Sequence, residues 1–299
     1  MKQAQFFQYL QYEKRYSAHT VKAYRSDLAQ FLQYLHQCYD SPQLECVTHH
    51  HIRSWMVELV DNGITTRSIN RKLSCLKSYF KFLRRQGHIA HNPMSKVQAP
   101  KIGKRLPTVV AEKQLAMLFE SVEFTDDFSG LRDRLVLELL YCTGMRRSEC
   151  AELKLSDYNA ERQQIRVLGK GNKERIIPIP AHLARLLEQY LEMRRRSFPT
   201  NHTPVLLLTD KGLPIDANHI YRCVKKYLSM VTTAEKRSPH VLRHSFATHL
   251  ANKGADLNAI KMLLGHSSLA ATEIYTHNSI ETLRKVYQQA HPKAKSPSP

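Results

Sequence analysis

Residues 92–107 read NPMSKVQAPKIGKRLP and divide the chain in two. Pro93, Pro100 and Pro107 are evenly spaced in this stretch, whereas Pro42 is the only proline before it. Proline interrupts helices and favours extended chain, so the stretch predicts a linker between two domains. The 299 residues leave room for two domains of ordinary size. We predict a first domain over residues 1–95, a basic linker over 96–107, a second domain over 108–290 and a flexible tail over 291–299.

The first domain is predicted to consist of helices only. They are expected over residues 3–14, 17–39 and 65–85, and in the segment that follows Thr48. In the helix over 65–85, apolar residues fall on one side and basic residues on the other. The apolar stripe comprises Ile69, Leu73, Leu76, Phe80 and Leu83. The basic stripe comprises Arg67, Arg71, Lys77, Lys81 and Arg85.

This basic stripe is a candidate DNA-binding surface. Seven Lys and Arg residues and no Asp or Glu lie between Thr65 and His88. Solvated helix faces usually mix both signs, so a face of one sign favours contact with phosphates over solvation alone. The linker also carries cations with no acid among them. We therefore predict that Lys101, Lys104 and Arg105 bind DNA together with the basic stripe.

The second domain is predicted to mix helices with a small antiparallel sheet. Short apolar runs flank Gly169-Lys170-Gly171-Asn172, which predicts a β-hairpin over 163–180. A third short strand is expected over 205–208. The predicted fold class is therefore mainly α, with a small antiparallel β-sheet in the C-terminal domain. Helices are expected over residues 111–121, 130–142, 181–196, 215–230, 239–253, 257–264 and 269–276.

The charge of the chain indicates nucleic acid as its partner. Lys and Arg number 45 against 26 Asp and Glu, a formal net charge of +19, and such an excess attracts a polyanion. No apolar run reaches the ~20 residues that cross a bilayer, and the N-terminus lacks the apolar core of a secretory signal. Six scattered cysteines without a C-x-x-C pair predict reduced, mostly buried thiols. We expect a cytoplasmic protein with no membrane segment.

Two turns of the second domain place a cation where a ligand can approach. In CTGMRRSE, residues 142–149, Gly144 is expected to end a helix and Ser148 to cap the next. Arg146 then lies in the turn, near a helix N-terminus that favours anions. Lys170 lies between two glycines at the tip of the predicted hairpin, where the backbone can come close to a ligand.

A third segment, SPHVLRH at residues 238–244, predicts a helix that begins at Pro239. His240 and Arg243 lie on one face near its N-terminus, so the two side chains can hold one phosphate together. His240 and His244 also have the i, i+4 spacing of a metal site. The glutamate of H-E-x-x-H and a third ligand are missing, which makes a zinc site the weaker alternative.

The fourth segment carries His266 and Tyr275, on two short helices expected to be joined through Gly265. With the residues above, the set contains two arginines, a lysine, two histidines and a tyrosine. It contains no carboxylate pair of the kind that a Mg²⁺ nuclease needs. Such a set is suited to metal-free phosphoryl transfer, in which arginines neutralise the phosphate oxygens and tyrosine attacks phosphorus.

Five motifs, TGMRRSE, VLGKGNKER, HVLRH, LLGHSS and EIYTH, follow one another along the second domain. In order and spacing they resemble the tyrosine recombinase (phage integrase) family, and most of all the Xer recombinases, over nearly the whole chain. The resemblance implies a SAM-like core-binding domain followed by a tyrosine recombinase catalytic domain. It also implies that Arg146 and Arg243 bind the scissile phosphate and that His266 donates a hydrogen bond to a phosphate oxygen.

The remaining three site residues would carry out the chemistry. The resemblance implies that Tyr275 is the nucleophile and forms a 3′-phosphotyrosyl bond to DNA. His240 would be its acid/base partner, and Lys170 would deliver a proton to the leaving 5′-oxygen. Because the phosphotyrosine conserves the free energy of the broken phosphodiester, no cofactor, ATP or metal ion is implied.

The implied function is site-specific recombination of double-stranded DNA through a Holliday junction, in the resolution of chromosome dimers at cell division. Four protomers would assemble on two DNA sites, and residues 280–290 would dock into a neighbouring subunit. The resemblance leaves open whether a second Xer-type recombinase shares the tetramer and whether a DNA translocase activates it. The sequence begins directly with the helical domain, which favours the compact Xer type.

Four alternatives remain on the sequence alone. The catalytic motifs are shared by integrases and invertases of mobile elements, and a type IB topoisomerase uses the same phosphotyrosine step without paired sites. A DNA-binding regulator with an inactive site is a further class. A metal-dependent hydrolase at His240 and His244 is the fourth alternative.

Overall fold

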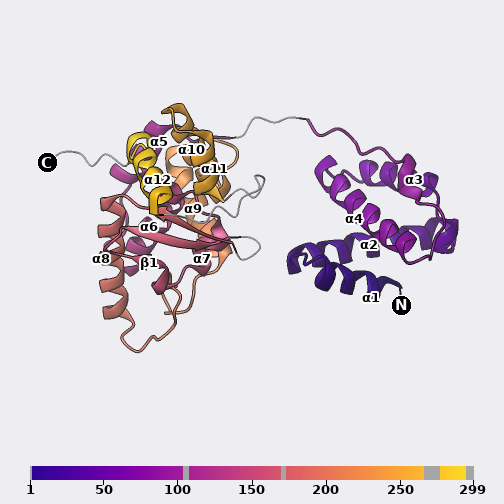
Figure 1. Ribbon diagram of the computed structural model, residues 1–299, viewed down its shortest axis with the longest axis horizontal. Helices are drawn as coiled ribbons and strands as arrows, with labels where there is room; N and C mark the ends of the chain where they lie inside the picture. Colours follow the sequence, from indigo (N-terminus) through magenta and orange to yellow (C-terminus); the bar gives the residue numbers. More distant parts are fainter. Residues whose placement is uncertain (1, 104–107, 170–172, 266–276, 294–299) are drawn as a thin grey trace. The chain divides into compact units, whose positions relative to one another are not determined.

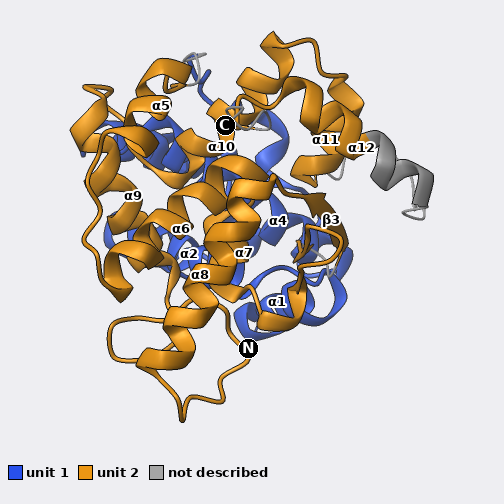
Figure 2. Cartoon of the chain, turned by 90° about the vertical axis from the view of Figure 1, so that its left-hand side faces the viewer, with its two compact units in different colours: residues 1–105 blue, residues 106–299 orange. Residues whose placement is uncertain are grey.

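The computed structural model describes residues 2–103, 108–169, 173–265 and 277–293. It divides the chain into two compact units, residues 1–105 and 106–299, which are coloured separately in Figure 2. Each unit has its own hydrophobic core.

The described residues of the first unit form helices and helical turns only, as the sequence predicts. Buried aromatic rings fill its core, among them Phe6, Phe31, Trp55 and Phe80. The side chain of Ser17 caps the second helix by accepting a hydrogen bond from the backbone nitrogen of Thr20. The elements, shown in Figure 1, are α1 (Lys2–Gln8), a π-helical turn η1 (Tyr9–Glu13), α2 (Ala18–Tyr39), η2 (Leu44–Cys46), α3 (His49–Asp61), α4 (Thr66–Arg85) and η3 (Pro93–Lys96).

Helix α4 has the two faces that its sequence predicts. The apolar stripe is buried in the core of the first unit, whereas the five residues of the basic stripe are exposed. Lys72 belongs to neither stripe: its ammonium group is buried and pairs with the carboxylate of Asp27 at 3.0 Å.

The chain on both sides of the predicted boundary at residue 96 is packed on the first unit. Pro93 and Met94 are buried, and Met94 belongs to the core of this unit. Asn70 of α4 donates a 3.0 Å hydrogen bond from Nδ2 to the carbonyl oxygen of Pro100. The chain from residue 93 to 100 is thus held against the helices, and Lys101 follows directly beside α4.

The second unit contains helices around a small antiparallel sheet with the strand order β1-β2-β3, which confirms the predicted fold class. Helix α12 contacts β3 and lies over the sheet in Figure 1. The predicted helix over 269–276 lies outside the described residues. The elements are α5 (Glu112–Glu120), α6 (Phe128–Thr143), α7 (Arg147–Glu152), η4 (Leu155–Asp157), β1 (Tyr158–Asn159), β2 (Gln164–Leu168), β3 (Glu174–Pro178), α8 (Ala181–Ser197), α9 (Ala217–Val231), α10 (Pro239–Asn252), α11 (Leu257–Leu264) and α12 (His277–Ala290).

The prediction of a third strand over 205–208 is wrong, because the third strand is β1. Val205 forms an isolated bridge with Lys154, and the backbone nitrogen of Leu206 bonds to the carbonyl oxygen of Leu153 at 2.7 Å. Leu206, like the two leucines that follow it, is buried. An apolar run that is buried on every side has no alternation, so its periodicity does not distinguish a strand from another buried segment.

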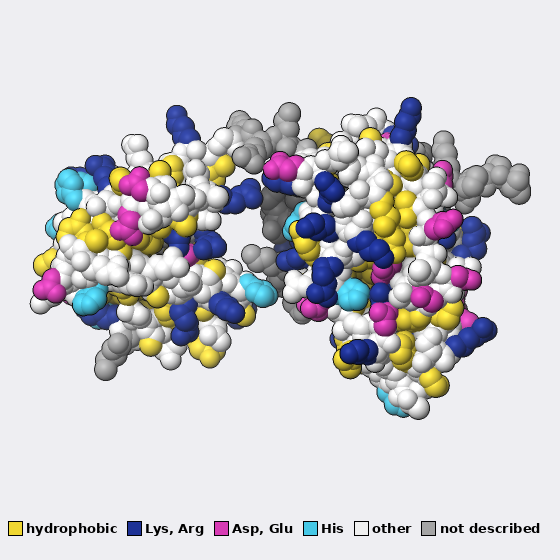
Figure 3. Space-filling model, turned by 180° about the vertical axis from the view of Figure 1, so that it is seen from behind, with side chains coloured by type: hydrophobic (Ala, Val, Ile, Leu, Met, Phe, Trp, Pro, Cys, Tyr) yellow, Lys and Arg dark blue, Asp and Glu magenta, His cyan; other side chains and the backbone are white. Residues whose placement is uncertain are grey.

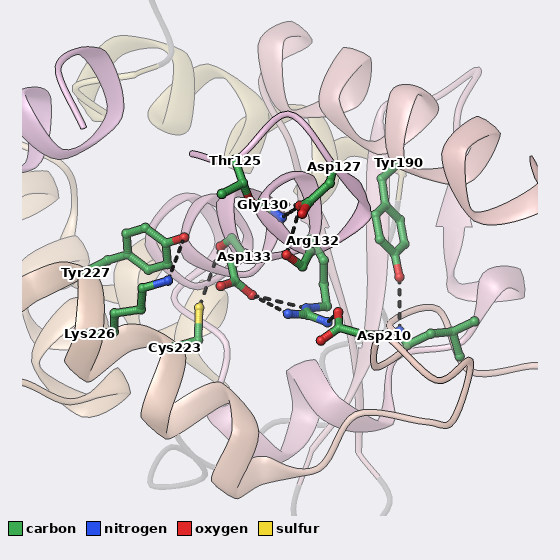
Figure 4. Close-up of polar contacts among 12 residues, drawn as sticks. Thr125, Asp127, Gly130, Arg132, Asp133, Tyr190, Asp210, Cys223, Lys226 and Tyr227 are labelled. Atoms are coloured by element: carbon green, nitrogen blue, oxygen red, sulfur yellow. Dashed lines mark hydrogen bonds and ion pairs between the residues drawn. The ribbon is translucent and has the colours of Figure 1, made fainter. Parts of the chain in front are cut away.

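A polar cluster at the start of α6 ties together elements of the second unit (Figure 4). Arg132 is buried and donates hydrogen bonds to the carboxylates of Asp133 and Asp210. Its charge is therefore compensated on both sides. None of these residues belongs to the predicted site, and we interpret the cluster as structural.

The C-terminal segment is anchored by a buried carboxylate of α6. The imidazole of His291 stacks on the ring of Tyr287, with ring centroids 4.6 Å apart. Lys293 pairs with Glu138, which is buried and also accepts a hydrogen bond from His182 at 3.3 Å. Burial acts to raise the pKa of Glu138, but His182 and Lys293 outweigh it and lower the pKa to about 2.

In the described ranges, no helix combines the length and the apolar character needed to span a bilayer.

Candidate active site

The turn between α6 and α7 sets the position of Arg146. Gly144 ends α6 in the left-handed conformation, with φ +59°. Arg146 is the N-cap of α7, and its backbone nitrogen donates a 2.7 Å hydrogen bond to Oε2 of Glu149. The predicted cap at Ser148 is wrong, because Ser148 lies inside the first turn and the longer side chain of Glu149 reaches back to the N-cap.

Glu149 lies between two arginines. Its Oε1 accepts a 2.7 Å hydrogen bond from Nη1 of Arg146. From the opposite element, Arg175 of β3 donates Nη2 to Oε2 at 2.7 Å and Nη1 to Oε1 at 3.1 Å. Burial acts to raise the pKa of Glu149, but the hydrogen bonds and charges of the two arginines hold the pKa below its ordinary value. Glu149 therefore remains a carboxylate that orients the Arg146 side chain.

Arg243, on α10, is 8% exposed and is held by backbone carbonyl groups. Its Nη1 donates to the carbonyl oxygen of Gly144 and its Nη2 to that of Leu264, each at 2.6 Å. These bonds join α10 to the turn before Arg146 and to the end of α11. Because the partners of Arg243 are uncharged, its positive charge remains available to a ligand.

Burial and neighbouring cations lower the pKa of two groups of the site, Arg243 and His240. Burial, with the charges of Arg146 and Arg175, lowers the pKa of Arg243 to about 10. Partial burial, followed by the charges of Arg147 and Arg243, lowers the pKa of His240 and keeps its imidazole neutral at pH 7. A bound anion would relieve this repulsion, so the arrangement favours a phosphate.

The structure thus brings together Arg146, His240 and Arg243. The other three predicted site residues, Lys170, His266 and Tyr275, lie outside the described residues. Sequence reasoning did not single out Glu149 or Arg175. A signal for Arg175 was present, since strand alternation places it on the same inward side as Ile177 of β3.

The predicted DNA-binding residues of the first unit differ in their partners. Arg71 makes a bidentate pair with the buried Asp27, at 2.9 and 2.8 Å. Arg85 pairs with Glu13 at 3.1 Å. The other described members are exposed as well: Arg67, Lys77, Lys81 and Lys101. Lys104 and Arg105 lie outside the described residues.

One group of possible metal ligands occurs in the described part of the chain. Donor atoms of Glu138, Cys142 and His182 lie within 4.8 Å of one another. Lys293 and His182 already pair with Glu138, so the charge of this carboxylate is compensated by side chains. Four cysteines are buried, as predicted for most of them, whereas Cys38 and Cys46 are exposed.

Comparison with known proteins identifies the family. The model of the phage integrase family matches residues 108–282, and that of the phage integrase N-terminal SAM-like domain matches residues 4–87. The chain belongs to the phage integrase family. It is therefore a tyrosine recombinase, an enzyme that cuts and rejoins DNA strands.

Relatives of this recombinase match over nearly its full length. It is 37% identical to the tyrosine recombinase XerC of Chlorobaculum parvum, over 97% of this chain and 94% of that protein. It is 35% identical to the tyrosine recombinase XerD of Staphylococcus haemolyticus, over 97% and 98%. Among solved structures, it resembles XerH recombinase in a post-cleavage complex with palindromic difH substrate, with a TM-score of 0.70, 25% identity and coverage of 90% and 79%.

Proposed function

We propose that this recombinase exchanges strands at a specific double-stranded DNA site, with the scissile phosphate held between Arg146 and Arg243. The observation that carries the proposal is the arrangement of these two arginines. Arg243 is buried on uncharged partners, and Arg146 is oriented by Glu149 at a helix N-terminus. Two guanidinium groups so placed can neutralise the non-bridging oxygens of a phosphate as charge develops on them.

The chemical step follows from the family resemblance and from the pKa of His240. The Tyr275 hydroxyl attacks phosphorus, a 3′-phosphotyrosyl bond forms and the bond to the 5′-oxygen breaks. A neutral His240 accepts the tyrosine proton, and Lys170 gives a proton to the leaving 5′-oxygen. His266 donates a hydrogen bond to a phosphate oxygen during this step. Attack by the 5′-hydroxyl of another strand on the phosphotyrosine reverses it. No metal ion takes part in this scheme.

Cationic surfaces of both units support binding of DNA. Figure 3 shows Lys and Arg side chains gathered on one face of the second unit.

The start of α10, which carries His240, borders a surface pocket of about 410 Å³. Three cations and one acid contribute to it, so its net charge suits backbone phosphates. The pocket is lined by Tyr221, Lys225, Glu235, Lys236, Arg237 and Ser238. In the first unit the basic stripe of α4 and Lys101 would contact the duplex.

The cellular role that we propose, from the resemblance to the Xer recombinases, is resolution of chromosome dimers in the cytoplasm. Four protomers would act on two sites, as a homo-tetramer or as a hetero-tetramer with a second Xer-type recombinase, and a DNA translocase is the candidate activator. Lys293 pairs with Glu138 of its own chain. In the tetramer, Lys293 of a neighbouring subunit would make the same pair with Glu138.

Covalent capture of genomic DNA tests this function. Wild-type protein and Tyr275→Phe are mixed with fragmented genomic DNA of the source organism in chelator, and DNA that survives detergent is sequenced. The proposal predicts adducts with the wild type alone, concentrated at one chromosomal site. Adducts at the ends of mobile elements would instead indicate an integrase or invertase, and scattered adducts a topoisomerase. Binding without any adduct would indicate a regulator and contradict the proposed chemistry.

A further inference from the structure

Arg175 lies at a junction of three segments that lead to site residues. It is 3% exposed on the inward side of β3. Two of its nitrogens bind Glu149, which in turn binds Arg146. Its third nitrogen, Nε, donates a 2.9 Å hydrogen bond to the carbonyl oxygen of Leu263 at the end of α11. One buried guanidinium thereby donates hydrogen bonds from all three of its nitrogens.

Two glycines that precede site residues in the sequence lie against this guanidinium. A Cβ atom on Gly169 would lie 3.5 Å from Nη1 of Arg175 and 3.6 Å from Oε1 of Glu149. A Cβ atom on Gly265 would lie 3.2 Å from Nη1, and Gly265 has φ +64°. The chain therefore passes close to Arg175 immediately before Lys170 and immediately before His266.

Arg175 also sets the net charge beside Arg146. A carboxylate that pairs with Arg146 alone would cancel the positive charge that Arg146 needs to hold a phosphate. Arg175 supplies a second positive charge to the same carboxylate, so the group of three keeps a net charge of about +1. The charge of Arg175 also contributes to the lowered pKa of Arg243, after burial and the charge of Arg146.

We propose that Arg175 is a positioning residue for strand cleavage. It fixes Glu149 so that Arg146 is oriented without being neutralised, and it holds in register the backbone segments that precede Lys170 and His266. It does not touch the scissile phosphate. This inference rests on the proposed function, because its measured effect is on the cleavage step.

Cleavage kinetics of four proteins test the assignment: the wild type, Arg175→Met, the double variant Glu149→Gln with Arg175→Met, and Arg132→Met. The last is a matched control, since Arg132 is also a buried arginine paired with carboxylates of the second unit. Single-turnover formation of the covalent adduct is measured on the captured duplex, at a temperature where each protein is shown to be folded. Affinity for the same duplex is measured separately.

We expect Arg175→Met to slow cleavage about 100-fold, the effect of losing one preorganised donor, with less than about a threefold change in DNA affinity. The double variant should recover about tenfold of the rate, because removal of both charges restores the net charge beside Arg146. Arg132→Met should lose stability but cleave at the wild-type rate once folded.

Several results would overturn the assignment. One is a folded Arg175→Met that cleaves within about threefold of the wild type. Another is an Arg132→Met that slows cleavage equally. If Arg175→Met does not fold, a folded double variant that cleaves within about threefold of the wild type would equally overturn it, because the double variant also lacks the contacts of Arg175 with Glu149 and Leu263. A wild type that forms no adduct would contradict the proposed function itself, which separates the two failures.

Discussion

Arg243 donates a 2.6 Å hydrogen bond from Nη1 to the carbonyl oxygen of Gly144, which lies 99 residues earlier in the chain. This bond sets the distance between the two arginines of the site, since Gly144 belongs to the turn that carries Arg146. It also leaves the charge of Arg243 uncompensated. The geometry of the proposed phosphate site therefore depends on the backbone at one glycine.

Gly144→Ala should destabilise the second unit and reduce cleavage. The residue has φ +59°, and a Cβ atom would lie 2.5 Å from Cδ1 of Phe246. We expect a loss of about 2–4 kcal/mol, from strain in the left-handed region together with overpacking. Gly254→Ala is the matched control, because Gly254 has φ +80° and open space around it. It should lose only about 1 kcal/mol in denaturant titrations. Equal losses in the two variants would show that the contact with Phe246 has no effect.

Arg146→Ala should bind DNA and barely cleave it. Loss of one preorganised donor to the phosphate corresponds to about 3 kcal/mol, or on the order of a hundredfold in the cleavage rate constant. Glu149 keeps its pair with Arg175 in this variant, so the fold should be retained. The measurement is adduct formation beside a binding titration, with the exposed Arg185→Ala on α8 as control. Near-normal cleavage by Arg146→Ala would remove this residue from the site.

The basic stripe of α4 should contribute to affinity and not to chemistry. Arg67→Ala and Lys81→Ala are each expected to lower the slope of log affinity against log salt by about one, with no loss of stability. Arg71→Ala should do the same and also cost about 1 kcal/mol of stability, because half-exposed Arg71 pairs with the buried Asp27. Unchanged salt slopes in all three variants would show that the basic stripe is solvated and does not contact DNA phosphates.

Cleavage should fall in acid as His240 becomes protonated. The structure lowers the pKa of His240 from 6.5, through burial and the charges of Arg147 and Arg243. The neutral form is the proton acceptor, so lowering the pH from 8 should reduce the rate with a midpoint below pH 6.5. Single-turnover rates across this range give the midpoint. A midpoint above pH 6.5, or an acid limb that persists in His240→Asn, would contradict this role.

Patterns that repeat within one element were predictable from the sequence. The hairpin of β2 and β3, the start of α2 after Ser17 and the two faces of α4 each follow from residues a few positions apart. The same local patterns placed Arg146, His240 and Arg243 at helix starts. The i, i+3 spacing also placed His240 beside Arg243. Only the family resemblance brought Arg146 to these two residues, since no local pattern relates positions so far apart in the sequence.

Pairs between distant residues were not predictable in this way. Arg71 was predicted to bind DNA, and its pair with Asp27, 44 residues away, was not predicted. Arg175 lies 26 residues from Glu149, and its pairs with Glu149 and Leu263 become visible only when β3 is packed against α7 and α11. The strand at β1 was missed because two residues carry too little alternation to be recognised.

The identity of the nucleophile is the central claim, and peptide mass spectrometry of the captured adduct tests it most directly. The wild-type adduct is digested with nuclease and trypsin, and the peptide that carries a nucleotide remnant is sequenced. We predict that the remnant lies on Tyr275, within the tryptic peptide over 262–284. A remnant on any other residue, or an adduct of unchanged yield with Tyr275→Phe, would contradict the account.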